Sequence, residues 1–566
     1  MTLKNLKIYF TAILLVLILW KCTYPRNPNT HNYNKPVKYD NRLLDSTRGY
    51  LNPMRSCYDV RFYHLNLSVF PDKKSIAGDV TMIFDVLDAT RKIQIELSEK
   101  LSIISIKENG LSLNYERQGK AVIISFAREL KAGEKITLVT SYEGKPKIAE
   151  KPPWRGGLVW KKKNGIDFIG VACEDDGASI WWPLKDHISD KPDSVMTTFN
   201  VPENLFCVSN GKLIEEREGD EGRMIYTWKT SYPINQYNVT FYLGPFRHFC
   251  LEYKNNSGTH PLDFYVMPEN FDKAKIHFEQ AIDVIEVFEE LFGEYPWWND
   301  GYKLVESPYA GMEHQTAIAY GSGYKNGKWI DYDYILVHET AHEWWGNAVT
   351  VCDMADLWIH EGFATYAEAL YMEKMGEPFD YDVMLSVDRS FCKNKRPMVG
   401  PHDVAYTNYR DGDIYSKGAV TLHTLRNVLD DDGVFFRIIY RFGTEYRDSC
   451  VTSQDFIDLV NAETKGDYTW LFNQFLYRPE PPELLWYYYA DGSNTKFIYR
   501  WNPDMTNADF KMPITVTVDG SDILLNPTTE LQSYQIKNGL YKALSIDRYA
   551  FCVFTESKKL MEELNQ

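Results

Sequence analysis

Two histidines stand four residues apart in the stretch 334–347, which reads YILVHETAHEWWGN. On a helix, His338 and His342 lie one turn apart on the same face. Two imidazoles in this arrangement can both reach one zinc ion, at about 2.0–2.1 Å each. Glu339 lies beside the first histidine, toward the open side of such a metal, where it can take a proton from bound water. The stretch therefore predicts a zinc-binding helix with Glu339 as general base.

A catalytic zinc needs a third protein ligand and one open coordination position. Glu361 follows His342 by nineteen residues, in a segment DLWIHEGFATYAEAL whose apolar residues have helical spacing. A second helix packed against the first would direct Glu361 at the ion and complete a hydrolytic site for one Zn²⁺ per chain. Glu368, two turns beyond Glu361, is either the acceptor that orients a ligand histidine or a solvent-facing glutamate.

The periodicity of apolar residues changes twice along the chain. Period-two runs such as Tyr63, Leu65, Leu67 and Val69 predict a β domain over 51–248. Helical spacing begins near residue 270 and continues to about 476, which predicts an α-rich domain over 249–477. Short alternating runs return after a proline cluster and predict a small β domain over 478–566. The predicted fold class is multidomain α+β.

Residues 1–22 have the composition of an export signal. Two lysines precede an uncharged stretch of thirteen residues, 8–20, which suits a signal peptide better than a membrane-spanning helix of about 20. Cys22 follows directly, as in lipidated bacterial lipoproteins, although Lys21 stands where a small residue is normally required. An uncleaved signal anchor is the alternative. Residues 23–50 are polar and aperiodic, and we expect them to form a tether.

The net charge of −16 argues against binding to nucleic acids or to anionic membranes through general electrostatics. Its two interpretations are attraction of cationic ligands such as free amino termini, and solubility alone. We therefore expect an exported protein of the cell envelope, periplasmic or membrane-anchored, that contacts a membrane only through its N-terminal segment. Apart from Cys22 the chain has eight cysteines, which would form disulfides in an oxidising compartment or remain buried thiols.

A segment 24 residues upstream of the histidines, residues 309–321, reads YAGMEHQTAIAYG. Together with His-Glu-x-x-His, eighteen residues and Glu, it resembles the gluzincin aminopeptidases, the group that contains aminopeptidase N and leukotriene hydrolase. That family carries Gly-x-Met-Glu-Asn on a strand that lines the active-site cleft. Ala310 and His314 depart from the family pattern, and Glu313 matches it.

Two further similarities occur in the family's order along the chain. Tyr415 and the three residues after it, Ser-Lys-Gly, resemble the family's Tyr-x-Lys-Gly, whose tyrosine donates a hydrogen bond to the oxyanion. Residues 171–186, VACEDDGASIWWPLKD, resemble the segment that supplies an acidic or amide residue from the β domain. Glu174 occupies that position, and Ser179 replaces the usual arginine. The resemblance spans roughly residues 55–560.

The resemblance implies roles beyond the metal ligands. Glu313 and Glu174 would bind the protonated α-amine of a peptide, so that only its first peptide bond lies over the metal. Tyr415 and zinc would stabilise the oxyanion. The exposed backbone at Ala310 and Gly311 would pair with the extended substrate as an added strand.

The resemblance also implies a saddle-like N-terminal β-sheet domain, a thermolysin-like catalytic domain and a small C-terminal β-sandwich. Many members of the family add a large helical C-terminal domain that closes over the cleft. We expect this chain to be a short form that lacks that domain and has a more open active site.

The function predicted from these residues is zinc-dependent hydrolysis of the first peptide bond of peptides with a free N-terminus. A zinc endopeptidase would not need the amine-binding carboxylates, which Glu313 argues against. An epoxide hydrolase would need a lipid tunnel, of which the sequence gives no sign. A non-catalytic peptide-binding relative would be expected to lose ligands or base, whereas all of them are present.

Overall fold

The computed structural model describes Tyr39 and residues 44–564, with gaps at 328–329, 377, 407–410, 519–520, 537–543 and 547–550. The chain divides into two compact units, Met1–Tyr39 and Asp40–Gln566, and every element below belongs to the second unit. The predicted export signal and most of the predicted tether lie outside the described residues. Among the described residues, no helix is both long enough and apolar enough to cross a membrane.

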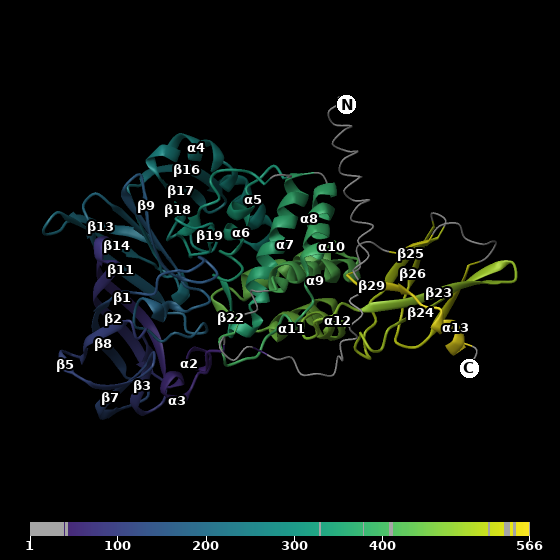
Figure 1. The fold of residues 1–566 in the computed structure, drawn as a ribbon, viewed down its shortest axis with the longest axis horizontal. Helices are drawn as coiled ribbons and strands as arrows, with labels where there is room; N and C mark the ends of the chain where they lie inside the picture. The colour runs from purple at the N-terminus through teal and green to yellow at the C-terminus, as the bar shows by residue number, and fades with distance from the viewer. Residues whose placement is uncertain are drawn as a thin grey trace. The chain divides into compact units, whose positions relative to one another are not determined.

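An eight-stranded sheet forms the first part of the folded body (Figure 1). Its strands are β1 (Tyr58–Phe70), β2 (Ser75–Val86), β4 (Leu101–Glu108), β5 (Leu111–Ser112), β8 (Lys135–Gly144), β11 (Ser194–Pro202), β13 (Lys212–Glu218) and β14 (Arg223–Lys229). They lie in the order β13-β14-β11-β1-β2-β8-β4-β5. The alternating apolar residues from Tyr63 to Val69 are buried, as predicted. A β-bulge between Val60 and Phe62 shifts which alternate residues face the core.

Two smaller sheets complete the N-terminal β domain. One contains β3 (Thr90–Glu96), β7 (Ala121–Leu130) and β6 (Asn114–Gln118), in that order. The other has the order β12 (Phe206–Ser209), β15 (Phe241–Gly244), β10 (Ile166–Ala172) and β9 (Gly157–Lys163). Two helical turns, α2 (Ser46–Gly49) and α3 (Pro53–Ser56), precede these sheets. Arg55 in α3 is fully buried and pairs with Glu96 at 3.3 Å, which fastens the segment to the domain.

A five-stranded sheet begins the next part of the chain, with β19 at its edge. Its order is β16 (Arg247–Asn255), β17 (Gly258–Val266), β18 (Tyr302–Glu306), β20 (Ile318–Tyr320) and β19 (Gly311–Met312). Met312 is 2% exposed and belongs to the hydrophobic core of the N-terminal β domain. Tyr309, just before β19, belongs to the same core. Packing of both side chains into this core therefore fixes an edge strand that has only two residues.

Helices form most of the rest of this part of the chain. They are α4 (Phe271–His277), α5 (Gln280–Phe292), α6 (Tyr334–Ala341), α7 (Trp358–Met375), α8 (Pro378–Phe391), α9 (Asp413–Leu429), α10 (Asp432–Glu445), α11 (Ser453–Thr464) and α12 (Thr469–Phe475), with a short parallel pair β21 (Val349–Val351) and β22 (Ser449–Val451). The helical spacing that starts near residue 270 belongs to two helices, α4 and α5. The chain turns at Phe278, whose ring is fully buried against Phe264 and Tyr320.

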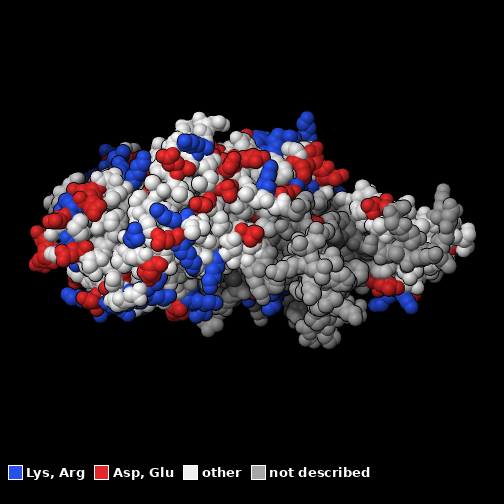
Figure 2. All heavy atoms as spheres, turned by 90° about the horizontal axis from the view of Figure 1, so that it is seen from above, with Lys and Arg blue, Asp and Glu red and all other residues white. Residues whose placement is uncertain are grey.

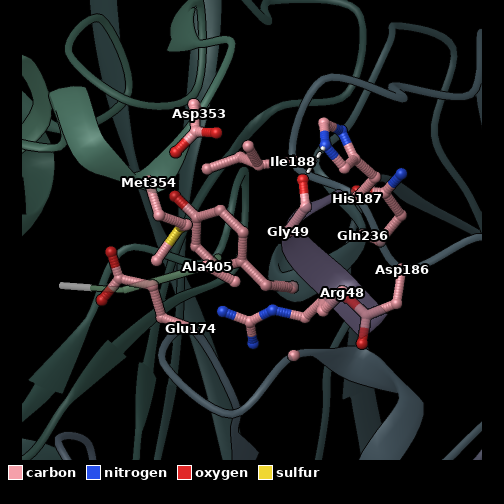
Figure 3. Close-up of a pocket in the computed structure, with 12 residues that line it drawn as sticks. Arg48, Gly49, Glu174, Asp186, His187, Ile188, Gln236, Asp353, Met354 and Ala405 are labelled. Atoms are coloured by element: carbon pink, nitrogen blue, oxygen red, sulfur yellow. Dashed lines mark hydrogen bonds between the residues drawn. The ribbon is translucent and has the colours of Figure 1, made fainter. Parts of the chain in front are cut away.

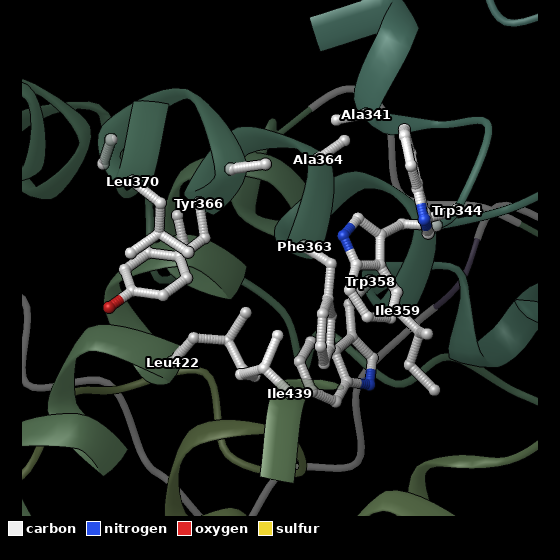
Figure 4. Close-up of a cluster of buried hydrophobic side chains, with 14 of the residues drawn as sticks. Ala341, Trp344, Trp358, Ile359, Phe363, Ala364, Tyr366, Leu370, Leu422 and Ile439 are labelled. Atoms are coloured by element: carbon white, nitrogen blue, oxygen red, sulfur yellow. The ribbon is translucent and has the colours of Figure 1, made fainter. Parts of the chain in front are cut away.

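Helix α7 is buried on every side over most of its length (Figure 4). An all-round apolar surface is expected of a helix inside a core. Its closest neighbour is α9, because Gly362 and Gly418 meet where the two helices cross. A Cβ atom on Gly362 would lie 2.8 Å from the Cα atom of Gly418. The glycine of the Tyr-Ser-Lys-Gly motif thus allows α7 and α9 to approach closely.

Two sheets form the C-terminal part of the chain, as expected for a small β-sandwich. The first has the order β27 (Gln532–Ile536), β24 (Asn494–Trp501), β23 (Glu483–Asp491) and β29 (Val553–Glu556). The second has the order β26 (Ser521–Leu525), β25 (Ile514–Val518) and β28 (Leu544–Ile546), and the helix α13 (Lys559–Leu564) follows. Trp501 and Val516, from the two sheets, share one hydrophobic core with the helical part.

Acidic and basic side chains are interspersed on the face drawn in Figure 2. Although the net charge of the chain is −16, the described acidic residues of this face do not form a single patch. The cysteines at positions 57, 173, 207, 250, 352, 392 and 450 are free thiols in this structure.

Candidate active site

Helix α6 directs the two histidines to one point. It begins after Asp333, whose Oδ1 accepts a hydrogen bond from Ile335 N at 3.1 Å. It ends one residue before His342, which caps the helix and keeps right-handed helical dihedral angles. The Nε2 atoms of His338 and His342 consequently lie 3.1 Å apart.

Helix α7 brings Glu361 to the same point in its first turn. His360 fixes the start of this helix, because its Nε2 accepts a hydrogen bond from Val351 N at 3.0 Å. Glu361 Oε2 lies 3.5 Å from His338 Nε2 and 3.3 Å from His342 Nε2. This buried oxygen completes no hydrogen bond with the described residues.

The three residues fit a divalent cation. One ligand atom from each of His338, His342 and Glu361 lies within 4.8 Å of the others. Two imidazole nitrogens and a carboxylate oxygen are the donor set of catalytic zinc sites that keep a coordination position open. Without a cation, two buried imidazole nitrogens and an unpartnered carboxylate oxygen would face one another at an energetic cost.

The other nitrogen of each histidine has its own partner. His338 Nδ1 lies 2.9 Å from Glu368 Oε1, and His342 Nδ1 lies 2.8 Å from the backbone oxygen of Trp345. A proton on each Nδ1 leaves the Nε2 lone pairs for a metal and fixes the orientation of both rings. Glu368 is therefore not the solvent-facing glutamate of the second alternative. It lies beside His338 and is 7% exposed. Trp345 contacts His342 through its backbone oxygen, and such a contact cannot be predicted from the residue type.

Glu339 faces the strand β19 across the site. It is 7% exposed, and the contact is so close that a Cβ atom on Gly311 would lie 2.3 Å from Glu339 Oε1. Burial raises the pKa of Glu339 to about 8, with Glu313 adding to the shift and the two site histidines opposing it. A cation at the histidines would lower this pKa, because it stabilises the ionised carboxylate.

The backbone of Gly311 lies on the last strand of its sheet. Gly321 N donates to Ala310 O at 2.7 Å, and Gly311 pairs with Tyr320 in the next register position. Hydrogen-bonded and non-hydrogen-bonded pairs alternate in antiparallel ladders, so the N–H and C=O of Gly311 point away from β20. Since β19 is the last strand of its sheet, an extended peptide can pair with these groups.

Glu313 and Glu174 are two further buried carboxylates near the site, and both lie close to Tyr237. Glu313, 4% exposed, follows β19 directly, and Tyr237 OH donates to its Oε1 at 3.1 Å. Glu313, Glu339 and His342 each offer an atom within 4.8 Å of the others. Glu174 follows β10 and is 9% exposed. Burial raises the pKa of Tyr237 well above its usual range, and both glutamates add to the shift. Tyr237 was not predicted as a site residue.

Tyr415 reaches the site from the first turn of α9. Its ring stacks on His338 with centroids 6.2 Å apart and planes 26° apart. Burial raises the pKa of Tyr415 well above its usual range, and the neighbouring Glu361 adds to the shift. The hydroxyl therefore remains protonated and can donate a hydrogen bond. His314 points elsewhere: its Nδ1 lies 2.6 Å from Tyr242 OH.

A cavity of about 20 Å³ adjoins Glu174 (Figure 3). Arg48 and Gly49 of α2 form part of its wall, opposite Met354. Arg48 is 5% exposed and donates from Nη1 to the backbone oxygen of Asp175 at 2.6 Å. Residues 46–49 belong to the segment that the sequence predicts to be a tether. A single arginine in a polar stretch does not indicate that its side chain lines a cavity beside Glu174.

Comparison with known proteins places these elements in one family. The model described as the peptidase M1 N-terminal domain matches residues 58–237, and the peptidase family M1 domain matches residues 276–475. Together the two models match more than half of the chain. The chain belongs to peptidase family M1. The predicted resemblance to the gluzincin aminopeptidases is thereby confirmed.

Relatives in the M1 family are distant in sequence. "Probable aminopeptidase 2" of Sulfurisphaera tokodaii is 22% identical over 80% of this chain and 58% of its own length. "Leucine aminopeptidase 2-1" of Meyerozyma guilliermondii is 25% identical over 74% of this chain and 69% of its own length. The chain thus spans little more than half of the first of these relatives.

A crystal structure of an M1 zinc metallopeptidase from Deinococcus radiodurans, a mutant bound to a Tyr-Ser-Ala substrate, has a similar fold. Its TM-score is 0.64 at 22% identity, covering 75% of this chain and 95% of that chain. The predicted order of a β-rich N-terminal domain, a helical catalytic domain and C-terminal strands agrees with this M1 fold.

The contact between Gly311 and Glu339 makes a Gly311→Ala exchange informative. The added methyl group would displace either the carboxylate or the strand, and an error of about 1 Å in such a site can lower turnover roughly 100-fold. We expect a loss of this size in kcat/KM on peptide substrates. Gly400→Ala is the matched control, because its new Cβ atom would have no neighbour closer than 3.4 Å. Equal activity of the two variants would contradict the contact.

The hydrogen bond between Glu368 and His338 should affect metal affinity. Removal of such a partner typically weakens metal binding about 10- to 100-fold. We expect this loss for Glu368→Ala, measured by competition with a chromophoric chelator. Glu373→Ala on the same helix is the control, because Glu373 instead pairs with Arg426 at 2.8 Å. Unchanged affinity in Glu368→Ala would mean that His338 is oriented without this carboxylate.

Proposed function

We propose that this chain is a zinc-dependent aminopeptidase that removes the first residue of peptides with a free N-terminus. One observation carries the proposal: Glu313, which directly follows the strand that would pair with substrate, offers an atom within 4.8 Å of atoms of Glu339 and His342. A carboxylate at that place can bind an α-amine while the first peptide bond lies at the metal site. The names of the matched relatives, which are aminopeptidases, also support it.

His338, His342 and Glu361 would hold the zinc ion. When bound, zinc polarises the scissile carbonyl and lowers the pKa of water. The chain's own groups do the rest of the chemistry. Glu339 accepts the proton of the attacking water and returns it to the leaving amine. Tyr415 OH donates a hydrogen bond to the oxygen that gains negative charge in the transition state.

Positioning of the substrate limits cleavage to the first bond. The protonated α-amine pairs with Glu313 and Glu174, and Tyr237 holds the first of these carboxylates in place. The N–H and C=O of Gly311 pair with the peptide backbone. Arg48, Gly49 and Met354 line the cavity beside Glu174, which has about the space of one water molecule. An N-acetylated peptide would lose the charge that Glu313 and Glu174 bind.

Hydrolysis of aminoacyl p-nitroanilides, free and N-acetylated, tests the proposal on the purified full chain. We expect release from the free amines only, loss of activity with a chelator and recovery with Zn²⁺. Equal cleavage of the acetylated substrates would instead indicate an endopeptidase. Bound zinc without turnover of any substrate would indicate a peptide-binding protein or a different substrate class.

We further propose that the protein is exported and acts in the cell envelope. The support is the sequence of residues 1–22 alone, two lysines, an uncharged stretch and Cys22. Cell fractionation of the full chain and of a Cys22→Ser variant separates the alternatives. Release of the variant from the membrane would indicate a lipoprotein, retention an uncleaved anchor, and a cytoplasmic wild type would exclude export.

A further inference from the structure

A cavity of about 480 Å³ lies at Ala310, where the free edge of β19 begins. Loop residues before β19 and the ends of β18 and β20 form one wall. The hairpin of β9 and β10 forms the opposite wall and contributes three consecutive lysines, Lys161, Lys162 and Lys163. The catalytic chemistry described above uses none of these lysines.

The three lysines differ in how their charges are compensated. Lys162 pairs with Asp167 at 3.3 Å, and Lys163 pairs with Glu306 at 3.0 Å and with Glu269 at 3.3 Å. Lys161 Nζ instead donates to a neutral acceptor, the backbone oxygen of Pro308, at 2.7 Å. Within the described part of the chain, no carboxylate lies within the 4.0 Å of an ion pair with Lys161.

The ammonium group of Lys161 can therefore bind a further anion. It has three N–H donors and uses one of them on Pro308. Its side chain is exposed and lines the cavity, so a ligand can approach it without displacing a protein carboxylate. A carboxylate would neutralise the charge and form a charge-assisted hydrogen bond.

A peptide that pairs with β19 would extend toward the ammonium group of Lys161. Pro308, which contacts Lys161, lies five residues before Glu313 on the segment along which the peptide would pair. On the other wall, Lys161 pairs with Phe168 of β10, six residues before Glu174. At about 3.3 Å per extended residue the two routes cover at most roughly 17–20 Å, and the bends at residues 308–310 shorten the first of them. A peptide whose amine lies between Glu174 and Glu313 would cover most of this span in four or five residues, and the lysine side chain reaches the rest.

We propose that Lys161 binds a carboxylate at the far end of short peptide substrates, which makes four- and five-residue peptides with a free C-terminus preferred substrates. This inference rests on the proposed aminopeptidase function and names its substrate class. The carboxylate is either the C-terminal α-carboxylate or an acidic side chain at the same distance from the amine.

The test compares kcat/KM for free-acid and amidated peptides of three to seven residues with the same first residue, using the full chain with zinc. We expect the ratio of free acid to amide to reach about 3- to 10-fold at four or five residues and to fall toward one at seven. In Lys161→Gln the ratio should be near one at every length. Because each ratio compares two substrates of one protein sample, partial misfolding of a variant cancels.

Lys162→Gln is the matched control, because it removes an adjacent charge that also lines the cavity but is already paired with Asp167. This variant should keep the wild-type ratio. An amidated peptide with glutamate at its last position identifies the source of the carboxylate: equal preference supports a site for either carboxylate, and no preference supports a site for the C-terminal one.

A ratio of one at all lengths in the wild type, or a ratio unchanged in Lys161→Gln, would overturn the inference. Failure of the proposed function is distinguishable from this result. The wild type would then not cleave aminoacyl p-nitroanilides, which are too short to reach Lys161.

Discussion

Replacement of Glu339 by glutamine is expected to lower kcat about 10²- to 10⁴-fold while leaving zinc binding intact. Glutamine has nearly the same shape but cannot accept a proton at neutral pH. The three ligand residues His338, His342 and Glu361 are unchanged, so the metal content should remain one per chain. Single-turnover hydrolysis of an aminoacyl anilide, together with elemental analysis of the same sample, measures both quantities.

The same exchange should also affect stability. Glu313, Glu339 and Glu361 crowd three buried carboxylates around one point, and burial already raises the pKa of Glu339 to about 8. At neutral pH Glu339 must therefore take up a proton when the metal-free chain folds, and a neutral glutamine avoids that cost. We therefore expect the metal-free Glu339→Gln variant to melt at or above the temperature of the metal-free wild type. Such a trade between activity and stability is common at active sites.

Two results would contradict the assignment of Glu339 as general base. One is a Glu339→Gln variant that keeps more than a tenth of the wild-type kcat with full metal content. The other is a large loss of activity that follows a loss of bound zinc, since this would make Glu339 important for metal binding instead of proton transfer.

The zinc site could be predicted because its information is local. The i, i+4 spacing of His338 and His342 specifies a shared helix face whatever surrounds the helix. Glu361 required one more assumption, that α7 packs against α6, and its apolar residues supported that assumption. The same locality explains why period-two alternation indicated β1 correctly despite the bulge before Phe62.

Other parts of the site depend on contacts between distant segments, which a single sequence does not specify. Arg48 reaches the cavity beside Glu174 because α3 is fastened to the β domain through Arg55 and Glu96. Tyr237 meets Glu313 only after β15 and β19 have been brought together. The division of one helical pattern into α4 and α5 also follows from tertiary packing, because Phe278 turns inward at the break.

Gly418 shows how a motif residue acquires its physical meaning from the structure. In the sequence, Tyr-Ser-Lys-Gly is a short pattern that occurs by chance in many chains. In the structure, its glycine allows α9 to cross α7 at Gly362, and this crossing carries Tyr415 to the metal site. The glycine thus positions the helix that carries the tyrosine, and the tyrosine hydroxyl is the group expected to contact the substrate.

Replacement of Tyr415 by phenylalanine is the second large effect that we expect. Loss of one hydrogen bond to the developing oxyanion typically lowers kcat about 10²- to 10³-fold. KM should change little, because the hydroxyl contributes mainly in the transition state. The phenyl ring can still stack on His338, where the tyrosine ring lies 6.2 Å away between centroids. Steady-state kinetics on one aminoacyl anilide gives both constants.

A buried tyrosine whose hydroxyl bonds to another tyrosine provides the control for Tyr415→Phe. Tyr366 on α7 shares a hydrogen bond of 2.8 Å with Tyr381 OH, and Tyr366→Phe removes a buried hydroxyl of the same kind. If both exchanges lowered kcat equally, the loss would reflect packing and not oxyanion stabilisation. If Tyr415→Phe raised KM and kept kcat, the hydroxyl would instead bind the substrate in its ground state. A selective fall in kcat is the result that assigns Tyr415 to the transition state.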